Sequence, residues 1–102
     1  MGNNLVVTVT LDNDRHVCNP MDMVVLPGDT VIWRWTGAGK LEVSFPADNP
    51  FDQPGPLAQD VPATVKKDAK PGKHKTETKI GGVPRPTIGD IIVAQKKVTP
   101  GP

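Results

Sequence analysis

The chain has 102 residues, 36% of them hydrophobic and 4% aromatic, and its formal net charge at pH 7 is +1. A chain of this length forms one small domain that buries about 60–65% of the surface its unfolded form exposes. The nearly balanced charge argues against a protein dedicated to nucleic acids or to a membrane surface, so we expect neither as a partner.

The compartment is left open by the sequence. Cys18 is the single cysteine, so no internal disulfide can form and cysteine pairing gives no information about the redox state of the surroundings. No run reaches the 18 or more apolar residues of a membrane span, and the first residues lack the basic and apolar regions of a signal peptide. A cleaved signal could still precede the chain.

The first half of the chain predicts four extended segments. Residues 5–11 alternate between apolar and polar side chains, which is the period of a half-buried strand. Three further extended segments follow at residues 17–25, 30–35 and 41–45. Because glycines at residues 37–39 separate the last two, we expect these to form a hairpin and the four segments to form a meander.

The second half begins with a long connection. Residues 46–62 contain five prolines, which predict an irregular surface loop. Residues 63–65 are compatible with a strand, residues 73–80 alternate as a strand with one wet edge, and residues 88–95 suit a terminal strand. Residues 96–102 are expected to form a flexible C-terminal tail. With no helical period, the pattern predicts an all-β, antiparallel β-sandwich.

Two segments carry a resemblance to a known family. Residues 20–45, PMDMVVLPGDTVIWRWTGAGKLEVSF, resemble the first half of a blue-copper protein, or cupredoxin. Residues 70–80, KPGKHKTETKI, resemble the family's segment in which a Pro-Gly turn leads into the strand that ends in the copper cysteine. The resemblance implies a cupredoxin-like Greek-key topology for one domain over residues 1–95, with Trp33 in the core.

The same resemblance implies that the copper ligands are missing. Leu41 stands where the family has its first copper histidine, and Thr78 stands where it has the copper cysteine. Residues 81–86, which should supply a histidine and a methionine, contain neither. The chain is also similar to small uncharacterised cupredoxin-like bacterial proteins without a copper set. We therefore expect no type I copper and no cofactor.

A different metal site is an alternative. His16, Cys18 and Met21 offer imidazole, thiolate and thioether groups, which soft metals prefer. Residues i and i+2 of a strand share a face, so His16 and Cys18 could converge on a copper or zinc ion. However, a free cysteine is commonly a small buried hydrophobic side chain, and a core role is the favoured interpretation.

Catalysis finds little support in the sequence. The chain has no glycine-rich phosphate loop, no GxSxG nucleophile motif and no tyrosine. Asp12-Asn13-Asp14 lacks the downstream glycine and glutamate of a calcium loop and fits a solvated hairpin. We therefore expect that the protein is not an enzyme.

The candidate partner-binding residues lie in two places. One is Phe51 in the proline-rich loop, and the other is the basic run, whose members include Lys66, Lys67, Lys73, Lys75 and Lys79. Clustered charge steers anionic partners, although such runs commonly serve solubility. Residues 1–58 are acidic overall and residues 59–102 basic, so self-association is an alternative. Trp35 could be core or part of a stacking platform.

These observations favour a non-catalytic binding or structural module on a copper-free, cupredoxin-like scaffold. Two alternatives stay open. One is a soft-metal carrier that uses His16, Cys18 and a methionine. The other is an anion-binding or self-assembling surface protein that acts through the lysine-rich strand.

Overall fold

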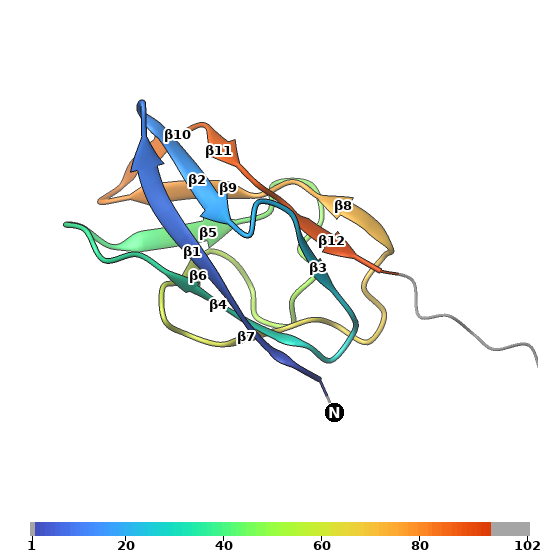
Figure 1. Cartoon of the computed structure of the whole chain (residues 1–102). Helices are drawn as coiled ribbons and strands as arrows, with labels where there is room; N and C mark the ends of the chain where they lie inside the picture. The colour runs from blue at the N-terminus through green and yellow to red at the C-terminus, as the bar shows by residue number, and fades with distance from the viewer. Residues whose placement is uncertain (1, 95–102) are drawn as a thin grey trace, which may run out of the picture.

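The computed structural model describes residues 2–94 of the chain, which form strands and no helix (Figure 1). Its first six strands are β1 (Asn4–Asp12), β2 (Arg15–Asn19), β3 (Met23–Val25), β4 (Thr30–Arg34), β5 (Leu41–Ser44) and β6 (Leu57–Ala58). The others are β7 (Ala63–Thr64), β8 (Gly72–His74), β9 (Glu77–Ile80), β10 (Val83–Arg85), β11 (Thr87–Ile88) and β12 (Ile91–Val93). The prediction of an all-β fold is confirmed.

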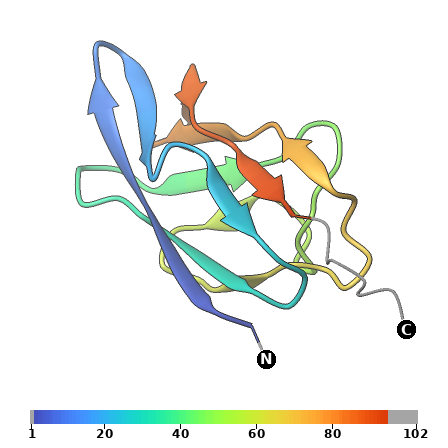
Figure 2. The ribbon, with the colours of Figure 1, turned by 45° about the vertical axis from the view of Figure 1, so that its right-hand side comes forward.

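The strands form two facing layers (Figures 1 and 2). One layer is a five-stranded sheet in the order β11-β2-β1-β4-β7, and a four-stranded sheet in the order β10-β9-β5-β6 lies behind it. A three-stranded sheet, β3-β12-β8, continues from the ends of β2, β11 and β9. The chain thus passes between the layers at several points.

The predicted meander and its wholly antiparallel pairing are wrong. β1 pairs with β2 in the antiparallel sense but with β4 in the parallel sense, and β11 with β2 and β12 with β3 are also parallel. β4 and β5, the expected hairpin, lie in different sheets. Their connection over residues 35–40 carries the chain from one layer to the other, so the glycine-rich turn does not join paired strands.

The core lies between the layers and is built mainly from aliphatic side chains. Its members include Val7, Val9, Val31, Leu41, Val43, Ile91 and Val93. The aromatic centre is Trp33, as expected, with its ring centroid 5.3 Å from that of Phe51 in an edge-on arrangement and 6.2 Å from that of Phe45. The three rings therefore form one packed aromatic group within a mainly aliphatic core.

Three breaks in the strands meet at Asp90. The extended segment predicted over residues 17–25 is divided into β2 and β3. The predicted strand over residues 73–80 is divided into β8 and β9, and the predicted terminal strand is divided into β11 and β12. The Asp90 carboxylate accepts a hydrogen bond from the Thr76 backbone N–H at 3.0 Å, while its own N–H donates to the Asp22 carboxylate at 3.1 Å. Its carbonyl accepts from the Met23 N–H. Asp90 therefore satisfies backbone N–H groups at two of the bends, and Asp22 satisfies the Asp90 N–H at the third.

The predicted tail over residues 96–102 lies outside the described residues, as does Gln95 at the end of the predicted terminal strand. Over residues 2–94 the structure contains no helix that is long and apolar enough to cross a membrane.

Candidate functional site

A hydrogen-bonded group of polar side chains lies between the layers, with two of its members buried and the third, Thr87, half-buried. His16 on β2 places its Nδ1 atom 2.6 Å from the hydroxyl oxygen of Thr78 on β9. That oxygen lies 2.7 Å from the hydroxyl oxygen of Thr87 on β11. His16 and Thr78 are 1% and 2% exposed. We call these three residues the buried polar cluster.

The buried polar cluster is closed by the backbone. The Thr78 N–H donates to the Thr87 hydroxyl oxygen at 3.1 Å, and the His16 N–H donates to the Pro86 carbonyl at 2.8 Å. Two proton arrangements satisfy the chain of contacts: the Thr78 hydroxyl donates to His16 Nδ1, or the His16 Nδ1–H donates to Thr78, which then donates to Thr87. Either way, the Thr78 hydroxyl group is fully engaged.

The environment of His16 favours the neutral imidazole. Burial lowers the pKa of His16 below its ordinary value of 6.5, and the positive charge of Arg85 lowers it further, while the contact with Thr78 acts in the opposite direction. Arg85 is held nearby by an ion pair of 3.3 Å with Asp14 on the β1–β2 turn. A neutral ring is the form that a buried hydroxyl network accommodates without a partner charge.

The fold places Leu41 and Thr78 on neighbouring strands. β5 and β9 are antiparallel, with Val43 opposite Thr78 and Leu41 opposite Ile80. Because alternate residues share a face, Leu41 and Thr78 are diagonal neighbours on the inner face of one sheet. Both are buried. The two positions that the resemblance assigns to metal ligands thus point into the same part of the core.

The proposed soft-metal set is divided between core and surface. His16 and Cys18 are both buried on the inner face of β2, as the alternation predicted, but Met21 is 55% exposed. Burial raises the pKa of the Cys18 thiol to about 11, and Asp90 and Asp22 act in the same direction. The thiol is therefore protonated at neutral pH. Within residues 2–94 no three or more His, Cys, Asp or Glu side chains are grouped to hold a metal.

Phe51 does not lie on the surface that the sequence analysis assigns to it. Its side chain is fully buried, and its backbone forms a bridge with Val65. The proline-rich loop folds inward at this point because its one aromatic side chain completes the cluster around Trp33. The loop's exposed residues include polar side chains such as Asp48 and apolar ones such as Val61, which is 51% exposed.

Trp35 lies at the edge of the core. Its side chain is half-buried, and its indole N–H donates to the Ala38 carbonyl at 3.2 Å. Gly37 lies so close to the ring that a Cβ atom there would be 2.3 Å from it. The ring is thus packed against its own loop, which leaves part of one aromatic surface accessible.

The predicted lysine run is divided among several surfaces. Lys79 lies on the outer face of β9 directly opposite Glu42, and Lys73 forms an ion pair with Asp90 at 3.6 Å. Lys66, half-buried, lines a small groove with Asp48 and Asp68. Lys67 is exposed. Acidic side chains thus accompany several of these lysines, a feature that sequence spacing did not reveal.

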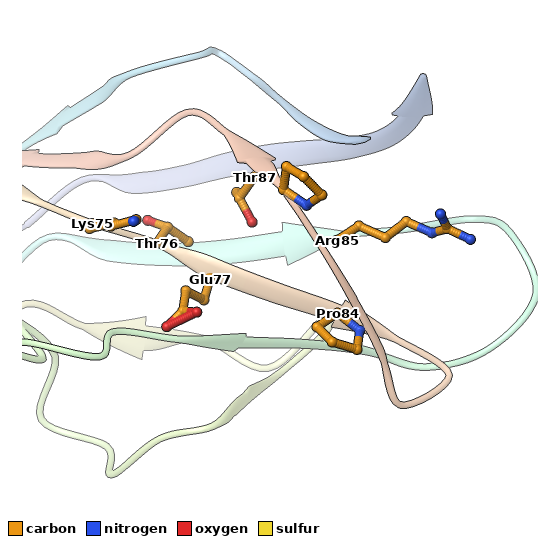
Figure 3. A pocket seen from close by; sticks show the side chains of 7 residues that line it. Lys75, Thr76, Glu77, Pro84, Arg85 and Thr87 are labelled. Atoms are coloured by element: carbon orange, nitrogen blue, oxygen red, sulfur yellow. The ribbon is translucent and has the colours of Figure 1, made fainter. Parts of the chain in front are cut away.

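Two grooves lie on either side of Lys75. The first, which we call the threonine groove, has a volume of about 420 Å³ and is lined by Lys75, Thr76, Glu77, Pro84, Arg85, Pro86 and Thr87 (Figure 3). The groove forms between β10, which pairs with β9 in one sheet, and β11, which pairs with β2 in the other sheet. Figure 3 shows Lys75 and Thr76 at one end and Arg85 extending away at the other.

The second groove, which we call the lysine groove, has a volume of about 300 Å³. It is lined by Ala47, Asp48, Lys70, Pro71, Lys73, His74 and Lys75. His74 is buried and closes its floor: Nδ1 lies 3.0 Å from the Asp48 carbonyl oxygen and Nε2 lies 2.7 Å from the Lys70 carbonyl oxygen. The ring therefore joins the proline-rich loop to the turn before β8.

Sequence reasoning missed Thr87, Asp90 and Asp48 as site residues. Thr87 precedes Ile88-Gly89 and Asp90 follows it, in a segment that was expected to form an uninterrupted strand from residue 88 onwards. Asp48 lies in a loop with no recognisable motif. A signal for the first two did exist, since a glycine within a strand pattern commonly marks a bend. Nothing in the sequence indicated that Asp48 would meet His74.

Comparison with protein families and with curated sequences identified no relative of this chain. The chain matches no protein-family model, and no curated protein sequence matches it significantly.

Proposed function

We propose that the protein is a non-catalytic binding or structural module, built on a cupredoxin-like Greek-key scaffold in which an interior polar network takes the place of the metal site. The observation that carries the proposal is the buried polar cluster. Thr78, which the resemblance aligns with the copper cysteine, engages its hydroxyl group with His16 and Thr87.

The side-chain chemistry at the aligned positions supports this proposal. Leu41 has no donor atom for a metal, and its neighbour Thr78 offers a neutral hydroxyl group instead of a thiolate. Type I copper requires histidine and cysteine ligands held in one place. The scaffold's interior at this point is stabilised by hydrogen bonds and aliphatic packing, which gives a rigid core and leaves surface grooves as the places for a partner.

The positions of His16 and Cys18 support a binding role over a reactive one. His16 is held against hydroxyl groups inside the core, where a substrate has no access. Cys18 is buried with a pKa raised to about 11, which disfavours both a nucleophilic and a metal-binding role. We therefore propose a binding role over the soft-metal carrier.

The proposal is tested by measuring the visible absorption of the wild-type protein and of one variant after incubation with Cu(II). Wild-type protein incubated with Cu(II) is expected to show no intense thiolate-to-copper absorption. A Leu41→His/Thr78→Cys variant in a Cys18→Ser background would place one thiol and one new imidazole on the aligned positions, beside His16. We expect this variant to gain the visible absorption band.

Each part of the proposal can fail separately. An absorption band in the wild-type protein would overturn the copper-free part. A folded double variant without the band, when its circular dichroism matches that of the Cys18→Ser parent, would count against the cupredoxin-like arrangement. The Thr78→Cys single variant is the control, since a lone thiol beside His16 lacks the second new ligand.

A further inference from the structure

The lysine groove concentrates positive charge in a shaped surface. Of its seven lining residues, Lys70, Lys73 and Lys75 carry ammonium groups and Asp48 carries the single carboxylate. Its volume of about 300 Å³ is at the lower end of the range found for small-molecule sites. The excess of cations over anions is what an anionic ligand requires.

The local backbone explains how the lysines converge. In the segment from Lys73 to Thr76, exposed and buried side chains alternate, so Lys73 and Lys75 point outward while His74 points into the floor. Two residues along a strand are about 6.6 Å apart. Lys70 lies just before the Pro71-Gly72 turn and lines the same groove as Lys73 and Lys75.

His74 makes the groove a built feature of the fold. Its two ring nitrogens contact carbonyl oxygens of Asp48 and Lys70, which belong to segments 22 residues apart in sequence. These contacts fix the relative position of the two walls. A ring with both nitrogens protonated donates both hydrogen bonds, whereas a neutral ring donates one.

The charges of the groove are incompletely neutralised. Lys73 lies 3.6 Å from Asp90, but among residues 2–94 no carboxylate lies within 4.0 Å of the ammonium group of Lys70 or Lys75. The neighbouring threonine groove differs, since it contains Glu77 and its Arg85 is paired with Asp14 and extends away from Lys75 (Figure 3). Lys79 faces Glu42 on another surface. The lysine groove is thus the better anion site.

The cationic side chains of the lysine groove are lysines, and this indicates which class of anion would bind there. An ammonium group acts as a compact point charge with three donors, whereas the planar fork of arginine matches a carboxylate. The lining residues include three lysines and no arginine, and none of them is a Phe, Tyr or Trp that would stack on a base or sugar face. We therefore expect the groove to recognise a multiply charged oxyanion, whereas the organic part of the ligand contributes little to binding.

We propose that the lysine groove binds a phosphate or sulfate ester, with Lys70 and Lys75 as its main contacts and His74 as the residue that positions them. This inference rests on the proposed binding role and supplies its ligand class. It assigns no reaction to the groove.

The test is a titration of isotope-labelled protein followed by backbone amide shifts. The probes are inorganic phosphate, a sugar phosphate, a sulfated disaccharide and the uncharged sugar. We expect saturable shifts confined to residues 47–48 and 70–75 with the anionic probes and none with the uncharged sugar. Tighter binding of either the phosphorylated or the sulfated sugar distinguishes the two sources of the anion.

A charge-matched pair of variants makes the test specific. Lys70→Gln/Lys75→Gln is expected to weaken binding about tenfold, because two charge contacts are lost. Lys67→Gln/Lys79→Gln removes the same charge from other surfaces and should change the affinity less than about twofold. Thermal unfolding of both variants checks that they fold.

Three outcomes would overturn the inference. They are shifts spread over all exposed lysines, equal weakening in the two double variants, and no saturable shift with any anionic probe. None of these results affects the copper experiment, which involves residues of the core. The copper experiment therefore tests the proposed scaffold, and the titration tests the anion site independently of it.

Discussion

His16 Nδ1 and the Thr78 hydroxyl oxygen lie 2.6 Å apart between the two layers, although 62 residues separate them in sequence. The contact joins β2 of the five-stranded sheet to β9 of the four-stranded sheet. Because both side chains are buried, His16 Nδ1 depends on Thr78 for its partner, and the pair helps to specify how the layers face each other. Four predictions follow from this pair and from the packing around it.

Replacing Thr78 by valine removes the hydroxyl group while keeping the shape of the side chain. His16 Nδ1 then loses its partner, and we expect the free energy of unfolding to fall by about 1–3 kcal/mol. Urea unfolding at pH 7.5 measures the change. Thr8→Val on the exposed face of β1 is the matched control and should change stability by less than about 0.5 kcal/mol. Equal effects of the two substitutions would contradict the structural role of the buried polar cluster.

The lowered pKa of His16 predicts a dependence of stability on pH. The unfolded state binds a proton near pH 6.5 and the folded state binds it only at lower pH, so this contribution is complete above pH 6.5. It is lost progressively as the pH falls from 6.5 towards the folded-state pKa. The free energies of unfolding at pH 7.5 and pH 5.5 should therefore differ more for wild-type protein than for His16→Gln.

Wild type and His16→Gln share every other ionisable side chain, so the difference between their pH dependences isolates His16. The same pH dependence in wild type and His16→Gln would show that the buried ring is not the group responsible. A nuclear magnetic resonance titration of the ring carbon of His16 would report its protonation directly.

Gly89 is required by a close approach of the backbone. Its φ is +121°, and a Cβ atom there would lie 2.1 Å from the Met21 carbonyl oxygen and 2.7 Å from Cys18 Cβ. Gly72 has a similar φ of +117° but open space around the Cβ position. We expect Gly89→Ala to destabilise the protein by roughly 1–3 kcal/mol more than Gly72→Ala, because overpacking adds to the backbone strain.

Urea unfolding of both variants measures that difference. If Gly89→Ala does not fold, hydrogen exchange of the wild-type amides near Gly89 provides a second test, since a tightly packed junction should be protected. Similar stabilities for the two alanine variants would mean that Gly89 and Met21 do not pack as the structure has them.

Cys18 should be chemically protected in the native protein. Its side chain is buried and its thiol pKa is raised to about 11, so little thiolate is present at pH 7.5. We expect a thiol-reactive reagent to modify the native protein at least about 100-fold more slowly than the urea-unfolded protein. Comparable rates under the two conditions would restore Cys18 as an accessible ligand or nucleophile.

The periodicity of the sequence predicted many strands because the period-2 pattern is local. Val7 and Val9 are buried and their neighbours exposed, as predicted, and His74, Thr76 and Thr78 alternate with exposed side chains. Leu11 follows the same pattern but is 49% exposed, because β1 extends there beyond the core at the β1–β2 turn. Alternation identifies a face but not the length of the layer that covers it.

Pairing between strands was beyond the reach of local patterns. Residues 30–45 read as a hairpin because two strands flank a glycine-rich turn, yet β4 pairs with β1 and β5 pairs with β9. These choices depend on contacts between segments far apart in the chain. The candidate site was affected in the same way, because Thr87 and Asp48 acquire their roles from distant partners.

The amino-acid sequence by itself determined the all-β class, the inward and outward faces of most strands, and the kinds of donor atom that are present or missing at Leu41 and Thr78. These properties depend on residue identity and on a two-residue period. The tertiary structure alone decided that His16 meets Thr78, that β4 pairs with β1, and which lysines of residues 2–94 lie beside a carboxylate. Burial and pairing are properties of the packed chain, because each depends on which distant segment excludes water from the side chain.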